Sequence, residues 1–333
     1  MKLLLTLGLS LLLTACVTPT GNRAAPTNGE KVTWQSVACT GAPVICNRMD
    51  ATGYFFAQPN ATAAVMITHG SQGLDSRLFE YADAARAAGF AALVIDHWSP
   101  RGIGVTHNDY VAAAQKGGNE FNMAFDSLTA VAWLRQRGFA KVGSIGESQG
   151  GGAAIALVQR WIHETVNRNV TRLYGKPFTA QPPDAVVGLY GYCGLRHAPR
   201  DAYLPTPFLF ITGAEDDETP SRYCEQYVPW MNGRGGAAKI IVLPGVGHSF
   251  DAPYRRQRNS SGPHYANCNL LVEAGPDGRG KVTELNSGTV TAGQDTWGAF
   301  SKCVRYGGYH SGYTGDRFVA VPHWTGFFRE HLR

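Results

Sequence analysis

Gly146-Glu147-Ser148-Gln149-Gly150 is the stretch that decides the fold, and it lies between an apolar run at 141–145 and an Ala-rich run beginning at 151. A serine flanked in this way, between a strand and a helix, is typical of a nucleophile elbow, a sharp turn that exposes the serine hydroxyl. Glycines suit both ends of the turn because side chains there would collide with neighbouring backbone. The alternative is a plain Gly-rich turn. The strand and helix on either side favour the nucleophile.

Short apolar runs alternate with longer amphipathic segments outward from this turn. The alternation predicts an α/β fold with a mostly parallel central sheet and helices on both faces. Residues 255–316, rich in Gly, Asn and Arg, interrupt the pattern and are interpreted as an insertion. We expect strands at 63–68, 90–95, 141–145, 185–190, 208–212 and 239–243, and helices at 76–88, 121–137, 151–164 and 324–332.

The composition is typical of one large globular domain. Of the 333 residues, 44% are hydrophobic and 17% charged, which supplies a core and argues against disorder. The formal net charge of +5 is scattered, without the Lys/Arg stripe or motif that nucleic acid would require. Internal repeats are absent, which excludes solenoids and propellers. We expect a single domain at 31–333.

The N-terminus has the pattern of an export signal. Lys2 precedes an apolar run at 3–13, which is too short to span a bilayer. Leu13-Thr14-Ala15-Cys16 resembles the lipobox of bacterial lipoproteins, in which the chain is cleaved before the cysteine and the cysteine is acylated. The alternative is an ordinary signal peptide with an incidental cysteine.

The lipoprotein interpretation divides the first thirty residues and suggests a location. We expect a signal peptide at 1–15 and a flexible, lipid-anchored tether at 16–30, with Cys16 as the lipidation site and the lipid as the only membrane contact. Val17 is not Asp, which by resemblance to Gram-negative lipoproteins favours the outer membrane. The domain would then face the periplasm or the cell surface.

Export also affects how the cysteines are interpreted. Without Cys16, an even six remain, as expected for disulfides in an oxidising compartment. Six cysteines allow 15 connectivities, of which we select nearest-neighbour pairing. A zinc site or a catalytic thiol is the alternative, but no Cys-x-x-Cys or Cys/His cluster supports it. The expected pairs are Cys39 with Cys46, Cys193 with Cys224, and Cys268 with Cys303.

A serine nucleophile requires a base, and the base requires an orienting carboxylate. In folds with this elbow the carboxylate and then the histidine follow the serine along the chain. His248 lies in a Gly-flanked loop directly after the expected strand at 239–243, where it could reach Ser148. The acid should follow the strand at 208–212, and we select Asp216 over Asp217, with Asp251 as a weaker competitor.

Acyl transfer also requires donors for the oxyanion. We expect one from the backbone N–H of Gln149 and the other from the loop after the strand at 63–68, at Ser71 with Gln72 in reserve. His69 in that loop is expected to have a structural role. Aromatic residues follow other strand ends, the side where such sheets bind ligands, although core packing is the alternative. The expected pocket residues are Trp98, Tyr190 and Tyr192.

Together these elements resemble the α/β-hydrolase superfamily and, within it, the dienelactone hydrolase family, over residues 60–250 and the last helix. Dienelactone enzymes carry cysteine as the nucleophile where this chain has Ser148, so the resemblance implies a serine esterase rather than hydrolysis of that lactone. A looser similarity, at Gln149-Gly150-Gly151-Gly152, is to secreted cutinases and polyester hydrolases. The motifs that carry the resemblance are His69-Gly70, 96–102, 146–150, 216–220 and 247–251; Asp96 and Arg101 in the second are expected to brace the site.

These observations predict a serine carboxylesterase of the α/β-hydrolase fold. Its partner would be a small-molecule or polymer ester, and neither a metal nor an organic cofactor is required. Three alternatives remain open. One is a peptidase or amidase of the same fold, the second is a polyester or cutinase-like hydrolase, and the third is a non-catalytic envelope lipoprotein that binds a ligand.

Overall fold

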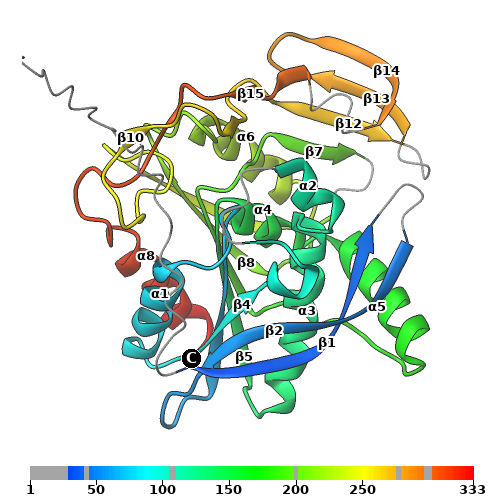
Figure 1. Ribbon diagram of the computed structural model, residues 1–333, viewed down its shortest axis with the longest axis vertical. Helices are drawn as coiled ribbons and strands as arrows, with labels where there is room; N and C mark the ends of the chain where they lie inside the picture. The colour runs from blue at the N-terminus through cyan, green and yellow to red at the C-terminus, as the bar shows by residue number, and fades with distance from the viewer. Residues whose placement is uncertain (1–28, 41–44, 105–109, 199–201, 275–278, 296–301) are drawn as a thin grey trace, which may run out of the picture.

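The computed structural model describes residues 29–40, 45–104, 110–198, 202–274, 279–295 and 302–333. An eight-stranded sheet forms the centre of the molecule, in the order β1-β2-β4-β3-β5-β6-β8-β9 (Figure 1). The pairs β1/β2 and β2/β4 are antiparallel and the other neighbours are parallel. The expected α/β-hydrolase fold, with its mostly parallel sheet, is therefore confirmed. The strands are β1 (Glu30–Thr40), β2 (Ile45–Phe56), β3 (Ala63–Thr68), β4 (Ala91–Asp96), β5 (Lys141–Glu147), β6 (Ala185–Leu189), β8 (Pro207–Gly213) and β9 (Ala237–Leu243).

Helices cover both faces of the sheet because its central strands are apolar on both sides. Val65 and Ile67 of β3 pack in the core under α1 and α8, whereas Ala64 and Met66 pack in the core under α3. Figure 1 shows α1 and α8 on one side and α3 and α5 on the other. The helices are α1 (Ser76–Ala87), the 3-10 turn η1 (Ser99–Arg101), α2 (Tyr110–Gln115), α3 (Glu120–Gln136), α4 (Gln149–Ala156), α5 (Arg160–Tyr174), α6 (Ser221–Asn232) and α8 (Val321–His331).

The expected strands are all present, but the single helix expected at 151–164 is wrong. The chain instead forms α4 and α5, separated at Leu157–Gln159. Gln159 forms an isolated bridge with Tyr203, and the N–H of Arg160 donates to the carbonyl of Ala202 at 2.9 Å. Pairing with this distant segment ends the first helix, and such a contact leaves no signal in local periodicity.

The hairpin of β1 and β2 was not expected from the sequence. In β1 exposed Lys31, Thr33 and Gln35 alternate with buried side chains, the period of a strand with one covered face. Cys39 of β1 pairs directly with Cys46 of β2 in the register and forms a disulfide with it. The hairpin therefore extends the sheet beyond β4.

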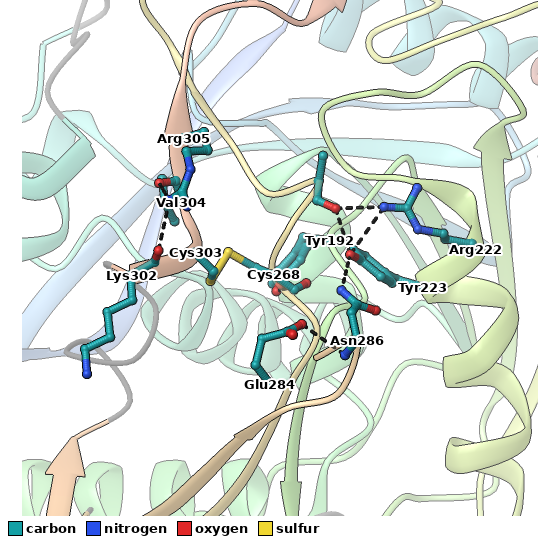
Figure 2. Close-up of a disulfide and its surroundings, with 11 residues drawn as sticks. Tyr192, Arg222, Tyr223, Cys268, Glu284, Asn286, Lys302, Cys303, Val304 and Arg305 are labelled. Carbon is teal, nitrogen blue, oxygen red and sulfur yellow. Dashed lines mark hydrogen bonds between the residues drawn. A yellow bond between two sulfur atoms is a disulfide. The ribbon is translucent and has the colours of Figure 1, made fainter. Parts of the chain in front are cut away.

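The insertion at 255–316 supplies three strands of a small sheet, in the order β14-β13-β12-β7, above the central one (Figure 1), and β7 comes from outside the insertion. The Cys268–Cys303 disulfide closes it, as expected. Two tyrosines beside this disulfide, both labelled in Figure 2, attach the insertion: the hydroxyl of Tyr223 on α6 donates to the carbonyl of Ala266 at 2.7 Å, and Tyr192 donates to that of Cys268 at 2.8 Å. The remaining strands are β7 (Leu195–Ala198), β10 (Gln257–Arg258), β11 (Pro263–His264), β12 (Leu270–Ala274), β13 (Arg279–Glu284), β14 (Thr289–Asp295), β15 (Arg305–Tyr306) and β16 (His310–Ser311).

The third expected disulfide, Cys193 with Cys224, also forms, so all three nearest-neighbour pairs are confirmed. This disulfide joins the segment after β6 to α6. In the sequence, the loop at 214–220 that follows β8 lies between the two cysteines. Among the described residues, no helix is long and apolar enough to cross a bilayer. The expected signal peptide at 1–15, Cys16 and almost all of the tether lie outside the described residues.

Candidate active site

Ser148 occupies the sharp turn between β5 and α4, with φ 49° and ψ −112°. A non-glycine residue in this region of backbone space is strained and persists only where its surroundings enforce it. The backbone around this turn is packed too closely for side chains. A Cβ at Gly146 would overlap the carbonyl of Gly150, and a Cβ at Gly150 would lie 2.6 Å from the carbonyl oxygen of Thr68. The two glycines thus let the turn close tightly and project the Ser148 side chain above the sheet.

The structure brings Ser148, His248 and Asp216 into one hydrogen-bonded chain. The Oγ of Ser148 lies 3.0 Å from Nε2 of His248, and Nδ1 of His248 lies 3.0 Å from Oδ2 of Asp216. His248 is 2% exposed, and its ring packs edge-on against Tyr190 with the ring centroids 4.9 Å apart. This geometry leaves Nε2 to accept the serine proton while Nδ1–H donates to the carboxylate.

Between the two adjacent acids, the structure places Asp216, not Asp217, beside the histidine. The Oδ1 of Asp216 accepts hydrogen bonds from the backbone N–H groups of Glu218 and Thr219, at 3.0 and 2.7 Å. The hydroxyl of Thr219 lies 3.0 Å from Oδ2 of Asp216 and 3.1 Å from Nδ1 of His248. Asp217 instead binds His310 of the insertion at 2.8 Å.

Glu218 lies on the other side of the imidazole. Its Oε2 is 3.5 Å from Nε2 of His248, the atom that faces Ser148, and its side chain is 13% exposed. Burial raises the pKa of Glu218 to about 7, against the opposing effect of His248. The sequence did not single out Glu218, because nothing in it distinguishes the direction of this side chain from that of its neighbours.

Two carboxylates therefore surround the imidazole. Burial lowers the pKa of His248, but the charges of Glu218 and Asp216 outweigh that effect and raise the pKa to about 9. Glu147 adds to the same upward shift. Below this pKa the imidazole is mostly protonated, and only its neutral form can accept the proton of Ser148.

Beneath this group, the guanidinium of Arg77 on α1 binds three buried carboxylates. It lies 2.5 Å from Asp75, 2.8 Å from Glu147 and 3.3 Å from Asp251. Asp75 lies in the loop after β3, Glu147 directly precedes Ser148, and Asp251 is the third residue after His248. The Arg77 side chain is 4% exposed, and the charges of Glu147 and Asp75 outweigh burial to raise its pKa further.

Two tyrosines complete the same cluster. The hydroxyl of Tyr190 donates at 2.5 Å to Glu147 and lies 2.6 Å from Asp251, while the hydroxyl of Tyr81 donates to Asp251. Burial raises the pKa of Glu147 to about 7, so this carboxyl takes up a proton near neutral pH. The proton reduces the net negative charge of three carboxylates around one guanidinium. Asp251, the weaker competitor for the triad acid, thus belongs to this cluster.

This cluster was not expected from the sequence. Arg77 and Tyr81 are four residues apart and therefore lie on the same helix face as the apolar Leu78 and Ala82. A charged residue on an apolar helix face is the signal in the sequence that could have identified the cluster.

The loop expected to supply an oxyanion donor lies against the nucleophile. A Cβ at Gly70 would be 3.1 Å from the Cβ of Ser148, and the N–H of Gly70 donates to Glu147 at 3.1 Å. The N–H of Gly73 donates to the carbonyl of Gly70 at 3.2 Å, which closes a turn whose central residues are half-buried Ser71 and exposed Gln72.

Gln149, the other expected donor, is the first residue of α4, where backbone N–H groups have no acceptor within the helix. His69 lies in the neighbouring loop. Its Nδ1–H donates to the carbonyl of Gly70 at 2.7 Å, and its Nε2 accepts from the N–H of His97 at 3.2 Å. Burial and the nearby His97 lower the pKa of His69 to about 4, so the ring is neutral and braces the loop.

Of the three aromatic residues expected to line a pocket, two are buried. Tyr190 is 0% exposed and lies under His248, and Trp98 is 2% exposed and packs against His69 with the ring centroids 5.5 Å apart. Tyr192 packs against Tyr265 of the insertion at 5.1 Å. The sequence places all three after strand ends but cannot show which way each ring turns.

Asp96 and Arg101 brace the loop after β4. Asp96 accepts the N–H groups of Trp98 and Ser99 at 3.1 and 3.0 Å. Arg101 binds buried Asp126 of α3 through both carboxylate oxygens, at 2.7 and 3.1 Å. Among the residues that the structure describes, no three His, Cys, Asp or Glu side chains are placed to hold a metal ion.

The insertion also contacts the loops that carry the histidine and the acid. The N–H of Gly312 donates to the carbonyl of His248 at 3.0 Å, and the N–H of Tyr265 donates to that of Glu218 at 2.9 Å. The hydrogen bond between His310 and Asp217 adds a third contact. The insertion is therefore part of the framework of the site.

Comparison with known proteins gives one family match. Residues 51–271, about two thirds of the chain, match the sequence model of the dienelactone hydrolase family, and this range includes Ser148, Asp216 and His248. No curated protein sequence matches significantly.

Several solved structures are similar at low identity. An α/β serine hydrolase without a lid from Xanthomonas campestris is 13% identical (67% of this chain and 87% of that chain covered, TM-score 0.42). The propionate-bound esterase Est2 of Thermogutta terrifontis is 15% identical (61% and 81% covered, TM-score 0.45). A putative dienelactone hydrolase of Klebsiella pneumoniae subsp. pneumoniae is 16% identical (68% and 90% covered, TM-score 0.42).

Replacing Arg77 by methionine should destabilise the protein strongly. The substitution leaves three buried carboxylates without their cation, and breaking a buried ion pair costs about 3–5 kcal/mol. Arg86→Met on the same helix is the matched control, because Arg86 is 36% exposed and its pairing with Asp83 should contribute less than about 1 kcal/mol. Urea unfolding measures both free energies of unfolding. Equal, small losses would show that the buried cluster does not stabilise the fold.

The reactivity of Ser148 should depend on pH through His248. Because only neutral imidazole acts as a base and its pKa is about 9, the rate of labelling by a fluorophosphonate should rise about tenfold per pH unit up to that pKa and then level off. Glu218→Gln removes a charge that raises the pKa and should move the rise to lower pH. Glu215→Gln, an exposed acid paired with Arg256, is the control. A rate already constant from neutral pH would contradict the elevated pKa.

Proposed function

The chain belongs to the dienelactone hydrolase family, and on that premise we propose that it is a serine hydrolase that cleaves carboxylic esters through Ser148, His248 and Asp216. One observation carries the proposal: the hydrogen-bonded chain of these three side chains begins at a strained serine between a strand and a helix. A hydroxyl, an imidazole and a carboxylate in this arrangement can form and hydrolyse an acyl-enzyme.

In the first half of the reaction, Oγ of Ser148 attacks the ester carbonyl carbon as its proton passes to Nε2 of His248. The N–H groups of Gln149 and Ser71 are proposed to stabilise the oxyanion, a contribution of about 3–4 kcal/mol for each donor. The tetrahedral intermediate then collapses. The bond to the alcohol oxygen breaks, and the proton on Nε2 passes to that oxygen.

In the second half, water attacks the acyl-enzyme and passes a proton to His248. The bond between the acyl carbon and Oγ breaks, the proton returns to Oγ, and the carboxylic acid leaves. Asp216 holds the imidazole in the tautomer with hydrogen on Nδ1 and stabilises the imidazolium, without itself being protonated. The steps require no metal ion or organic cofactor.

The first test is hydrolysis of p-nitrophenyl acetate and butyrate by residues 17–333, refolded under oxidising conditions, beside Ser148→Ala. The wild type should turn over these unhindered esters, and the variant should lose about 10⁴-fold or more in kcat, because the nucleophile is removed. A folded wild type that is inactive on both esters and unlabelled by a fluorophosphonate would favour ligand binding. Cleavage of an amino-acid p-nitroanilide, but not of the esters, would favour a peptidase.

We further propose that the protein is exported and anchored by lipid on Cys16, with the membrane contacted only through that lipid. Three disulfides among the described residues support an oxidising compartment. Leu13-Thr14-Ala15-Cys16 supports acylation after cleavage, and more than one acyl chain anchors a protein stably. The outer membrane is the proposed location, since Val17 follows the cysteine.

Replacing Cys16 by alanine should therefore release the protein from the membrane fraction, because the acceptor of the lipid is removed. Expression of the full chain in a Gram-negative host, with a radiolabelled fatty acid, measures both location and acylation. The wild type should carry the label and sediment with outer membranes. A wild type that is unlabelled and soluble in the periplasm would contradict the lipid anchor but not export.

A further inference from the structure

The position of Glu218 bears on the alcohol part of the substrate. The Oε2 of Glu218 is 3.5 Å from Nε2 of His248, and Nε2 is the atom that delivers a proton to the departing alcohol in the proposed mechanism. That alcohol oxygen must then lie within hydrogen-bond distance of Nε2. By this geometry it lies no more than roughly 6–7 Å from the Glu218 carboxylate. A group one or two carbons beyond the ester oxygen can therefore reach Glu218.

Two neighbouring acids and two tyrosines of the insertion lie near Glu218. Burial is the main cause of the raised pKa of Glu218, and the charges of Asp216 and Asp217 add to it; burial likewise raises the pKa of Tyr309, and the charge of Glu218 adds to that shift. Tyr309 packs against His264 with the ring centroids 5.8 Å apart, and Tyr265 donates its N–H to the carbonyl of Glu218. Carboxylates beside aromatic rings are the chemistry that attracts organic cations.

We propose that Glu218 determines specificity for esters whose alcohol carries a cationic nitrogen close to the ester oxygen. The inference rests on the proposed function, because it assigns the alcohol side of that same site. Glu218 contacts the substrate's cation and takes no part in making or breaking bonds. A neutral alcohol of the same shape leaves the carboxylate without a partner other than His248.

Acetylcholine and 3,3-dimethylbutyl acetate test this inference, because they have nearly the same shape and differ in the charge of one atom. At about pH 8.5 Glu218, with a pKa of about 7, is ionised. The wild type should then favour acetylcholine by at least tenfold in kcat/KM, about 1.4 kcal/mol. Glu218→Gln should lower the ratio of the two substrates by about tenfold. A changed basicity of His248 affects both substrates alike and cancels in this ratio.

Glu215→Gln is the matched control, because Glu215 is an exposed acid of the same loop, paired with Arg256. Glu215→Gln should keep the wild-type ratio of kcat/KM for the two substrates. The loss of one negative charge from this loop would then not explain the effect of Glu218→Gln, and direct contact at Glu218 would. The wild type at about pH 5.5 provides a second measurement that needs no variant. There Glu218 is protonated while His248 is already a cation, so the preference should fall.

The outcomes distinguish the two proposals. Hydrolysis of p-nitrophenyl acetate with a substrate ratio near one in the wild type overturns the inference and leaves the proposed function standing. A preference that survives in Glu218→Gln also overturns it. Failure to hydrolyse any of the three esters contradicts the proposed function, and the inference is then wrong with it.

Discussion

The pairing of one buried guanidinium with three carboxylates is the interaction on which the site depends. Arg77 joins Asp75 in the loop after β3, Glu147 beside Ser148, and Asp251 in the loop that carries His248. These segments are far apart in sequence, and the low dielectric of the interior strengthens their attraction to one cation. A buried cation that lost any of these partners would be costly, so the three loops are held in one mutual arrangement.

Steric constraint acts together with this electrostatic one. The turn at Ser148 is possible because Gly146 and Gly150 carry no side chains that would overlap the backbone beside them. The price is a strained serine, at φ 49°, that the surrounding strand and helix keep in place. Strain here aims the hydroxyl at His248, and the cluster beneath fixes the position of the residue before it.

The insertion contributes a third constraint from above. Its residues Tyr265, His310 and Gly312 bind the loops of Glu218, Asp217 and His248 respectively. The loop at 214–220, which carries Asp216 and Glu218, is thus held by the Cys193–Cys224 disulfide, by the insertion and by His248. The side chain of Glu218 is placed beside Nε2 by this packing, which is how an additional acid comes to face the nucleophile's side of the imidazole.

The sequence by itself determined the fold class and the positions of the central strands, and it indicated the three side chains that the structure brings together, Ser148, Asp216 and His248. These leave local signals, since apolar runs, glycines beside a serine and the order of residues along the chain are properties of short segments. It did not determine the break between α4 and α5, the orientation of Tyr190, the partners of Arg77 or the approach of Glu218 to His248. Each of these is decided by contacts between segments distant in the chain, and the direction of a side chain is set only when those segments pack together.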